Sequence, residues 1–143
     1  MLGITPALTR LSDENVDVRR RAVDELDTGP VAHRFALRHV LVTDDDAEVR
    51  ARAARKLGEA RIRRATTALL DAAHDPMPSV RDQAFRALGK LGAKDLETIA
   101  AETIRREPVW WVRRSAIRAV AAALKTDALE LLIEALADPF WRV

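Results

Sequence analysis

Residues 44–57 read DDDAEVRARAARKL, and the same arrangement of an acid, a Val-Arg pair, an alanine and a leucine recurs along the chain. The Val-Arg pair returns at intervals of 31, 31 and 32 residues. Its four occurrences are Val18-Arg19, Val49-Arg50, Val80-Arg81 and Val112-Arg113. A period in the low thirties is typical of arrays of two-helix units. The sequence therefore predicts a stack of similar helical repeats.

The Val, Ala and Leu positions of each repeat are four residues apart, so they form one stripe of a helix. We expect this stripe to be the core: Val18, Ala22, Leu26, Val49, Ala53, Leu57, Val80, Ala84, Leu88, Val112, Ala116 and Val120. An acid stands five residues before each Val, as Asp13, Asp44, Asp75, Glu107 and Asp138. A carboxylate there suits an N-cap or first-turn position. Arg55, Arg86 and Arg118 are expected to reach solvent.

Breaks in the pattern divide each repeat into two helices. First helices are predicted over 15–27, 46–58, 78–91 and 109–124, and second helices over 30–42, 61–73, 94–105 and 127–137. Gly58 and Gly89 stand near the predicted ends of first helices. We expect one domain, 1–143, with units at about 13–43, 44–74, 75–106 and 107–137 and partial units at 1–12 and 138–143.

The pattern D-x-x-x-x-V-R-x-x-A-x-x-x-L resembles the HEAT-repeat family, specifically the short HEAT-like repeats of the phycobilisome-lyase type. The resemblance implies an all-α, right-handed α-solenoid of about four two-helix repeats plus partial repeats at each end. It also implies that the second helices line a concave surface that grips partners. The fourth unit departs by having Glu107 in place of Asp, and the fifth stops at Val143, inside an expected first helix.

The composition excludes several classes of protein. The chain has no Cys, which excludes disulfides and thiol chemistry. The formal net charge of +2 does not by itself indicate a nucleic-acid partner. The sequence contains no run of about 18 apolar residues, the length needed to span a membrane. Its N-terminus lacks the basic and apolar regions of a signal peptide. We therefore expect a cytoplasmic protein that does not interact with membranes.

No motif indicates catalysis, a metal or a cofactor, so we expect a non-enzymatic protein. None of His33, His39 and His74 is followed by Glu, so the His-Glu pairs of HEAT-like iron hydroxylases are missing. Phosphate loops and Ser-His-Asp spacings are also missing. The arginines of the Val-Arg pairs recur with the same period as the acids. This predicts ion pairs that join neighbouring units, rather than a row of phosphate ligands.

The second helices carry the candidate partner-binding residues. Their early part is basic, with Arg34, Arg38, Arg61, Arg63 and Arg64, and their late part is acidic, including Glu102, Glu130 and Glu134. This polarity predicts electrostatic steering of a protein partner of unknown identity. A uniform polyanion such as DNA would be repelled by the acidic part.

Trp110 and Trp141 are equivalent in the repeat, and Trp110 is predicted to pack in the core. Trp111 replaces residues that are polar in the preceding units, so it is either a contact residue or locally packed. Phe140 and Trp141 are candidates for self-association in a weak homodimer. The leading hypothesis is a protein-protein interaction scaffold that binds on the second-helix face. The alternatives are a nucleic-acid backbone binder of the HEAT-like DNA-repair type, or a regulatory repeat module of a larger enzyme or lyase complex.

Overall fold

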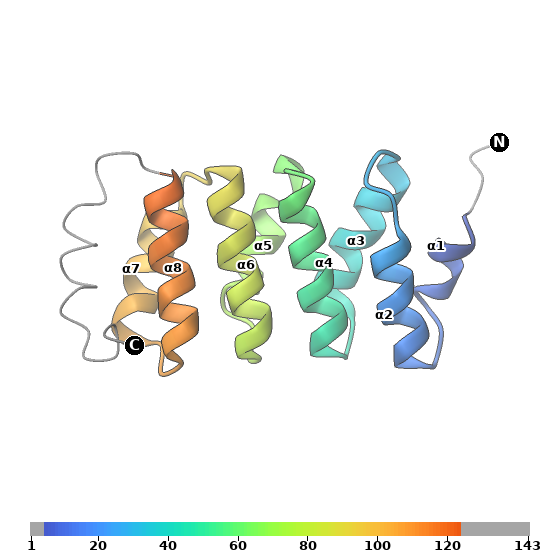
Figure 1. The fold of residues 1–143 in the computed structure, drawn as a ribbon, viewed down its shortest axis with the longest axis horizontal. Coiled ribbons are helices and arrows are strands. Elements are labelled where there is room, and N and C mark those ends of the chain that lie inside the picture. The colour runs from blue at the N-terminus through green and yellow to red at the C-terminus, as the bar shows by residue number, and fades with distance from the viewer. Residues whose placement is uncertain (1–4, 124–143) are drawn as a thin grey trace.

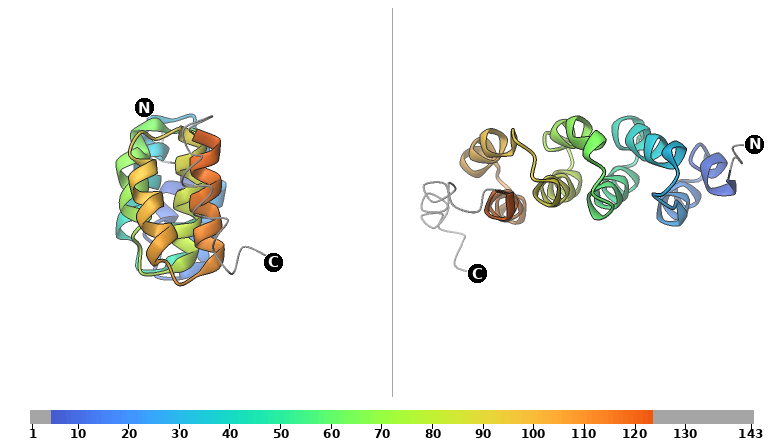
Figure 2. Two further views of the ribbon diagram at one scale, coloured as in Figure 1. Left: turned by 90° about the vertical axis from the view of Figure 1, so that its left-hand side faces the viewer. Right: turned by 90° about the horizontal axis from the view of Figure 1, so that it is seen from above.

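The helices form two parallel rows in the computed structural model, which describes residues 5–123 (Figures 1 and 2). The first row contains α2 (Val16–Glu25), α4 (Ala47–Glu59), α6 (Pro78–Leu91) and α8 (Trp110–Ala123). The second row contains α3 (Val31–Thr43), the 3-10 turn η1 (Arg63–Ala65) with α5 (Thr66–Ala72), and α7 (Leu96–Arg106). The short helix α1 (Pro6–Arg10) precedes them. The described part of the chain is thus an all-helical α-solenoid.

The predicted stripe forms the core between the two rows. Eleven of its twelve residues are buried, while Arg55, Arg86 and Arg118 are exposed, as expected. The exception is Val18, which is only half-buried. Val18 belongs to the first described unit, which within residues 5–123 follows the short helix α1 and not a complete unit. Its equivalents Val49 and Val80 lie on α4 and α6, each of which has a first-row helix on both sides, and they are fully buried.

The acid before each first helix does not cap it, contrary to the prediction. The caps of α2 and α4 are Asn15 and Asp46, whose side chains accept the N–H groups of Asp17 (2.9 Å) and Val49 (3.0 Å). The predicted acids lie earlier and close a turn onto the N–H group two residues ahead. These turns join Asp13 to Asn15, Asp44 to Asp46, Asp75 to Met77 and Glu107 to Val109.

Gly58 and Gly89 are packing residues inside helices, not helix breaks. Both are buried, and α4 and α6 continue past them to Glu59 and Leu91. A Cβ atom at position 58 would lie 2.5 Å from the Cβ of Ala87, and one at position 89 would lie 2.8 Å from the Cα of Ala119. The first-row helices therefore approach one another so closely that only glycine fits.

Gly58→Ala should destabilise the protein by about 1–3 kcal/mol, the usual effect of overpacking a closely packed interior. Without the close contact, the same substitution should stabilise the helix, because alanine is favoured over glycine by about 1 kcal/mol inside an exposed helix. Urea unfolding of Gly58→Ala beside Gly29→Ala measures it. Gly29 is an exposed loop residue near only its neighbour's flexible Asp27 carboxylate. A Gly58→Ala protein as stable as the wild type would contradict the close contact.

Candidate partner-binding site

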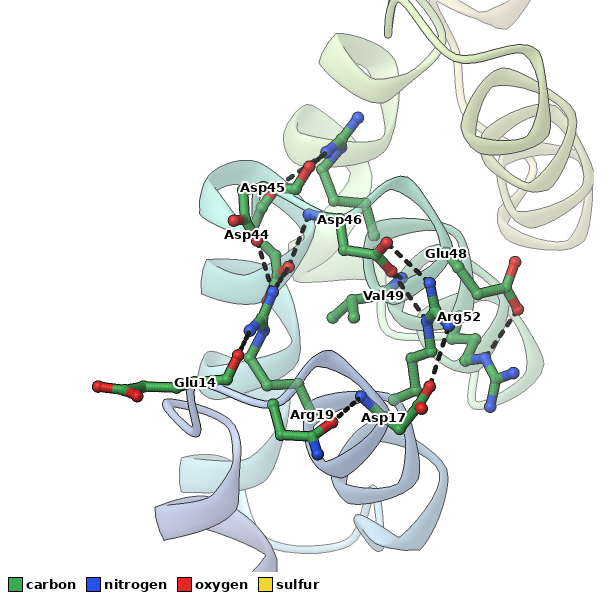
Figure 3. Close-up of polar contacts among 12 residues, drawn as sticks. Glu14, Asp17, Arg19, Asp44, Asp45, Asp46, Glu48, Val49 and Arg52 are labelled. Carbon is green, nitrogen blue, oxygen red and sulfur yellow. Dashed lines mark hydrogen bonds and ion pairs between the residues drawn. The ribbon is translucent and has the colours of Figure 1, made fainter.

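Three arginines of the Val-Arg pairs, Arg19, Arg50 and Arg81, join successive units, as predicted, and Figure 3 shows Arg19 beside Asp44. Arg19 bonds the carboxylate of Asp44 at 3.0 and 3.2 Å, and Arg50 bonds Asp75 at 2.8 and 2.9 Å. Arg81 does the same to Glu107 at 2.7 and 2.8 Å. The third guanidinium nitrogen of each donates to the carbonyl oxygen of the acid in its own unit. These arginines hold the array together and are not free to bind a ligand.

Other first-row arginines also have carboxylate partners. Arg20 bonds Asp46. This hydrogen bond lowers the pKa of the Asp46 carboxyl and outweighs the opposite effect of its burial. Arg52 bonds Glu48 at 2.8 Å, and its guanidinium pKa is raised by that contact. Further pairs are Arg55 with Asp24 (3.1 Å) and Arg86 with Asp82 (2.9 Å). The high arginine content of the first row is therefore largely neutralised within the fold.

The arginines of the early second-row region instead gather around one open groove. It has a volume of about 610 Å³ and lies between α3 and the segment that joins α4 to η1. We call it the α3 groove. Its lining residues are Val31, Arg34, Phe35, Arg38, Ala60, Arg61, Ile62, Arg63 and Arg64. The structure thus brings together all five basic residues predicted for this face, with no carboxylate among the lining residues.

Within residues 5–123, most of these guanidinium groups have no anionic partner. No carboxylate of residues 5–123 forms an ion pair with Arg34, Arg38, Arg63 or Arg64. The Nε of Arg38 is buried and has no hydrogen-bond partner in the described structure. Arg61 donates from Nη1 to the carbonyl oxygen of Lys90 at 3.1 Å. The groove therefore carries positive charge that is available to an external anion.

An apolar ridge on α3 borders the same groove. Val31, Phe35 and Val42 are 68%, 67% and 63% exposed, respectively. They are four and seven residues apart, so they lie along one face of the helix, and Val31 and Phe35 line the groove. This ridge was not predicted from the sequence. The available signal was that these apolar residues fall outside the repeating Val-Ala-Leu stripe.

The acidic part of the predicted face is only partly described. Glu102 lies exposed on α7 and forms an ion pair with Arg106 at 3.2 Å. Glu130 and Glu134 lie outside the described residues, as do Phe140 and Trp141. The structure thus describes the basic part of the second-helix face. The acidic part of this face stays a prediction.

The two tryptophans of α8 are both exposed, Trp110 by 40% and Trp111 by 41%. The prediction that Trp110 packs in the core is therefore wrong. Its repeat equivalents Val16, Ala47 and Pro78 are only half-buried, so a larger ring at this rim position extends into solvent. The ring instead packs under the guanidinium of Arg114, 5.0 Å from its centroid, and edge-on to Trp111 at 6.0 Å. Neither tryptophan lines the α3 groove.

The histidines are not brought together. His33 is buried and bonds the carbonyl oxygen of Asp27 (2.7 Å) and the hydroxyl of Thr5 (3.0 Å), whereas His39 and His74 are exposed. Between residues 5 and 123, His, Cys, Asp and Glu form no group of three that could hold a metal ion. In the same part of the chain, no helix combines the length and apolarity needed to cross a membrane.

Comparison with known proteins shows which family the chain belongs to. No curated protein matches the chain. Among solved structures, one similar chain belongs to the complex of CpcE and CpcF of phycocyanin lyase from Nostoc sp.. The two chains are 20% identical and superpose with a TM-score of 0.60, over 93% of this chain and 70% of the other. Residues 35–121 match the family of HEAT repeats. This match covers more than half of the sequence, so the chain belongs to the HEAT-repeat family.

Proposed function

We propose that this chain is a non-enzymatic protein-protein interaction module that binds a partner protein on its second-helix face, at the α3 groove. The observation that carries the proposal is the set of five arginines around one groove without a carboxylate among its lining residues. Charges of this kind steer a complementary partner and fix its orientation. The apolar ridge of α3 supplies the surface that a bound partner would cover.

Arginine side chains beside exposed apolar residues are typical of the centres of protein interfaces, where arginine and aromatic residues are enriched. In the α3 groove Phe35 is the aromatic candidate, and Arg34 and Arg38 flank it along α3. Trp111 remains a candidate contact residue at a separate place, the first turn of α8. In Figure 1 this turn lies at the lower edge of the array, whereas α4 ends at the upper edge.

Binding of a nucleic-acid backbone is a second candidate function, because the same five arginines could contact phosphates. It is less favoured for two reasons. The tryptophans that could stack on bases do not line the groove, and the apolar ridge has no use in contacts to phosphate. A steep fall in affinity for duplex DNA with rising salt would support this function. A third possibility is that the module regulates a larger enzyme or lyase complex, in which case a catalytic partner would occupy the groove.

Site-specific photocrosslinking in cells of the source organism tests the proposal. A photoreactive amino acid replaces Phe35 in the groove or Arg21, an exposed residue of α2 that does not line it. We expect a discrete protein adduct at position 35 only, and its loss when Arg34→Glu and Arg64→Glu are added. Equal adducts at both positions, or an adduct at position 35 that survives both charge reversals, would refute the assignment of the binding face.

A further inference from the structure

Arg61 occupies a backbone position that favours glycine. It follows the last turn of α4 with a φ angle of 52°, and its N–H bonds the carbonyl of Gly58 while Ile62 N–H bonds that of Leu57. Helix α6 ends with the same pair of bonds, but the left-handed residue there is Gly92, with a φ angle of 61°. Positions 61 and 92 are one repeat apart. Left-handed backbone disfavours side chains with a Cβ, so a non-glycine residue there suggests a function for its side chain.

Arg61 stands where two grooves meet. Together with Arg63 it lines the α3 groove and also a second groove of about 910 Å³ over α4, α6 and α8. We call this second one the first-row groove. Its other cations are Lys90 and Arg118, together with Arg55 and Arg86, which already pair with Asp24 and Asp82; among the described residues that line it, Glu59 is the one acid. Arg55, Arg86 and Arg118 are repeat equivalents, so each of three successive units contributes one arginine to it.

The chemistry of the first-row groove differs from that of the α3 groove. Its apolar lining consists of Leu91 and small residues: Ala87, Gly89, Gly92, Ala119, Ala122 and Ala123. Among the described residues no aromatic side chain lines it, so residues 5–123 offer there neither an aromatic anchor nor a stacking platform for bases. Arg118 and the Lys90 ammonium have no carboxylate partner in the described structure. This groove is therefore suited to the purely anionic portion of a ligand.

We infer that the partner contributes an extended acidic polypeptide segment that runs from the α3 groove, past Arg61 and Arg63, into the first-row groove. The inference rests on the proposed function, since it names the chemistry of the partner at that same site. Apolar side chains of the segment would pack on Val31 and Phe35, and carboxylates would follow the arginines. A straight helix could not follow this path from one row to the other, so the segment is extended.

The length of the path makes the inference testable. Neighbouring helices pack about 8–10 Å apart, so the path from α3 over α4 and α6 to α8 measures roughly 30 Å. A peptide of about six residues reaches at most about 20 Å, whereas one of about eighteen reaches about 60 Å. Only the longer peptide can occupy both grooves.

The experiment measures binding of fluorescent peptides of these two lengths, each mixing glutamate with leucine, by anisotropy. Two double variants remove charge from one groove each: Arg34→Gln with Arg38→Gln, and Lys90→Gln with Arg118→Gln. We expect either double variant to weaken the long peptide at least fivefold, and only the first to weaken the short one. Arg21→Gln, on the surface of α2, is the matched control and should leave both affinities unchanged.

Arg61→Gly is the decisive single variant. It should weaken the long peptide severalfold while the melting temperature stays the same or rises, because glycine fits the left-handed position better. A long peptide insensitive to Lys90→Gln with Arg118→Gln would overturn the continuous path. So would tighter binding of a single-stranded oligonucleotide of equal charge that depends on Arg61. If photocrosslinking at position 35 succeeds but neither peptide binds, this inference fails and the proposed function stands.

Discussion

Arg81→Ala should lower the free energy of unfolding by about 3 kcal/mol, because it removes one partner of a buried ion pair and leaves the other unpaired. The Arg81 and Glu107 side chains are only 14% and 6% exposed and are joined by two parallel hydrogen bonds. Arg81 also donates to the carbonyl oxygen of Asp75 at 2.8 Å. The substitution therefore breaks the tie between the third and fourth units of the array.

Two further variants locate the cause of that loss. Arg81→Lys should recover only part of the stability, because an ammonium group cannot make two parallel bonds to a carboxylate. Arg21→Ala removes an exposed arginine of α2 and should change the stability by less than about 0.5 kcal/mol, as surface substitutions do. Urea unfolding followed by circular dichroism measures all three. If Arg81→Ala unfolds like the wild type but no longer binds the acidic peptides, Arg81 is a ligand-binding residue instead.

The repeat pattern predicts the architecture well because each helix of a solenoid packs only on its neighbours. A residue's burial then follows from its place in the repeat, and a place in the repeat can be read directly from the sequence. This is why Val49, Ala84 and Leu88 are buried where the Val-Ala-Leu stripe predicts them. The same logic predicted the ion pairs between units, since the arginines and the acids recur with one period.

The distances between helices could not be predicted in the same way. Periodicity shows which face of a helix packs inward but not how closely two backbones approach. Gly58 and Gly89 therefore looked like helix breaks, although the structure places them where adjacent helices come nearest. Val18 shows a second limit. Its place in the repeat is that of Val49, but within the described residues only the short helix α1 precedes its unit, and Val18 is half-buried.

The candidate site, too, could be predicted from the sequence only in part. Counting charges on the second helices identified the arginines of the α3 groove, because second helices of successive units lie side by side (Figure 2). The sequence could not show that these guanidinium groups lack carboxylate partners while those of Arg19 and Arg50 have them. That difference depends on which side chains come within reach after folding. The sequence likewise could not show that Arg61 adopts the left-handed backbone conformation that Gly92 adopts one repeat later.

Leu88→Ala should destabilise the protein by about 2–5 kcal/mol, the range for truncating a large aliphatic side chain in a packed core. Leu88 is fully buried in α6. This helix packs on α4 and α8 within the first row and on α5 in the second row. A cavity there weakens the contacts of this unit with the units on both sides. In a repeat array these contacts between neighbouring units supply part of the stability.

The matched comparison is Leu11→Ala, which truncates the same side chain where it is only half-buried, beside the short helix α1. Less apolar area returns to water there and the site is open to solvent, so we expect a loss of about 1 kcal/mol. Urea unfolding of the two variants, analysed with a common slope, gives the difference directly. A loss below about 1 kcal/mol for Leu88→Ala would mean that the stripe is not the core. Equal losses at both positions would mean that Leu11, beside α1, is packed as tightly as Leu88 in α6.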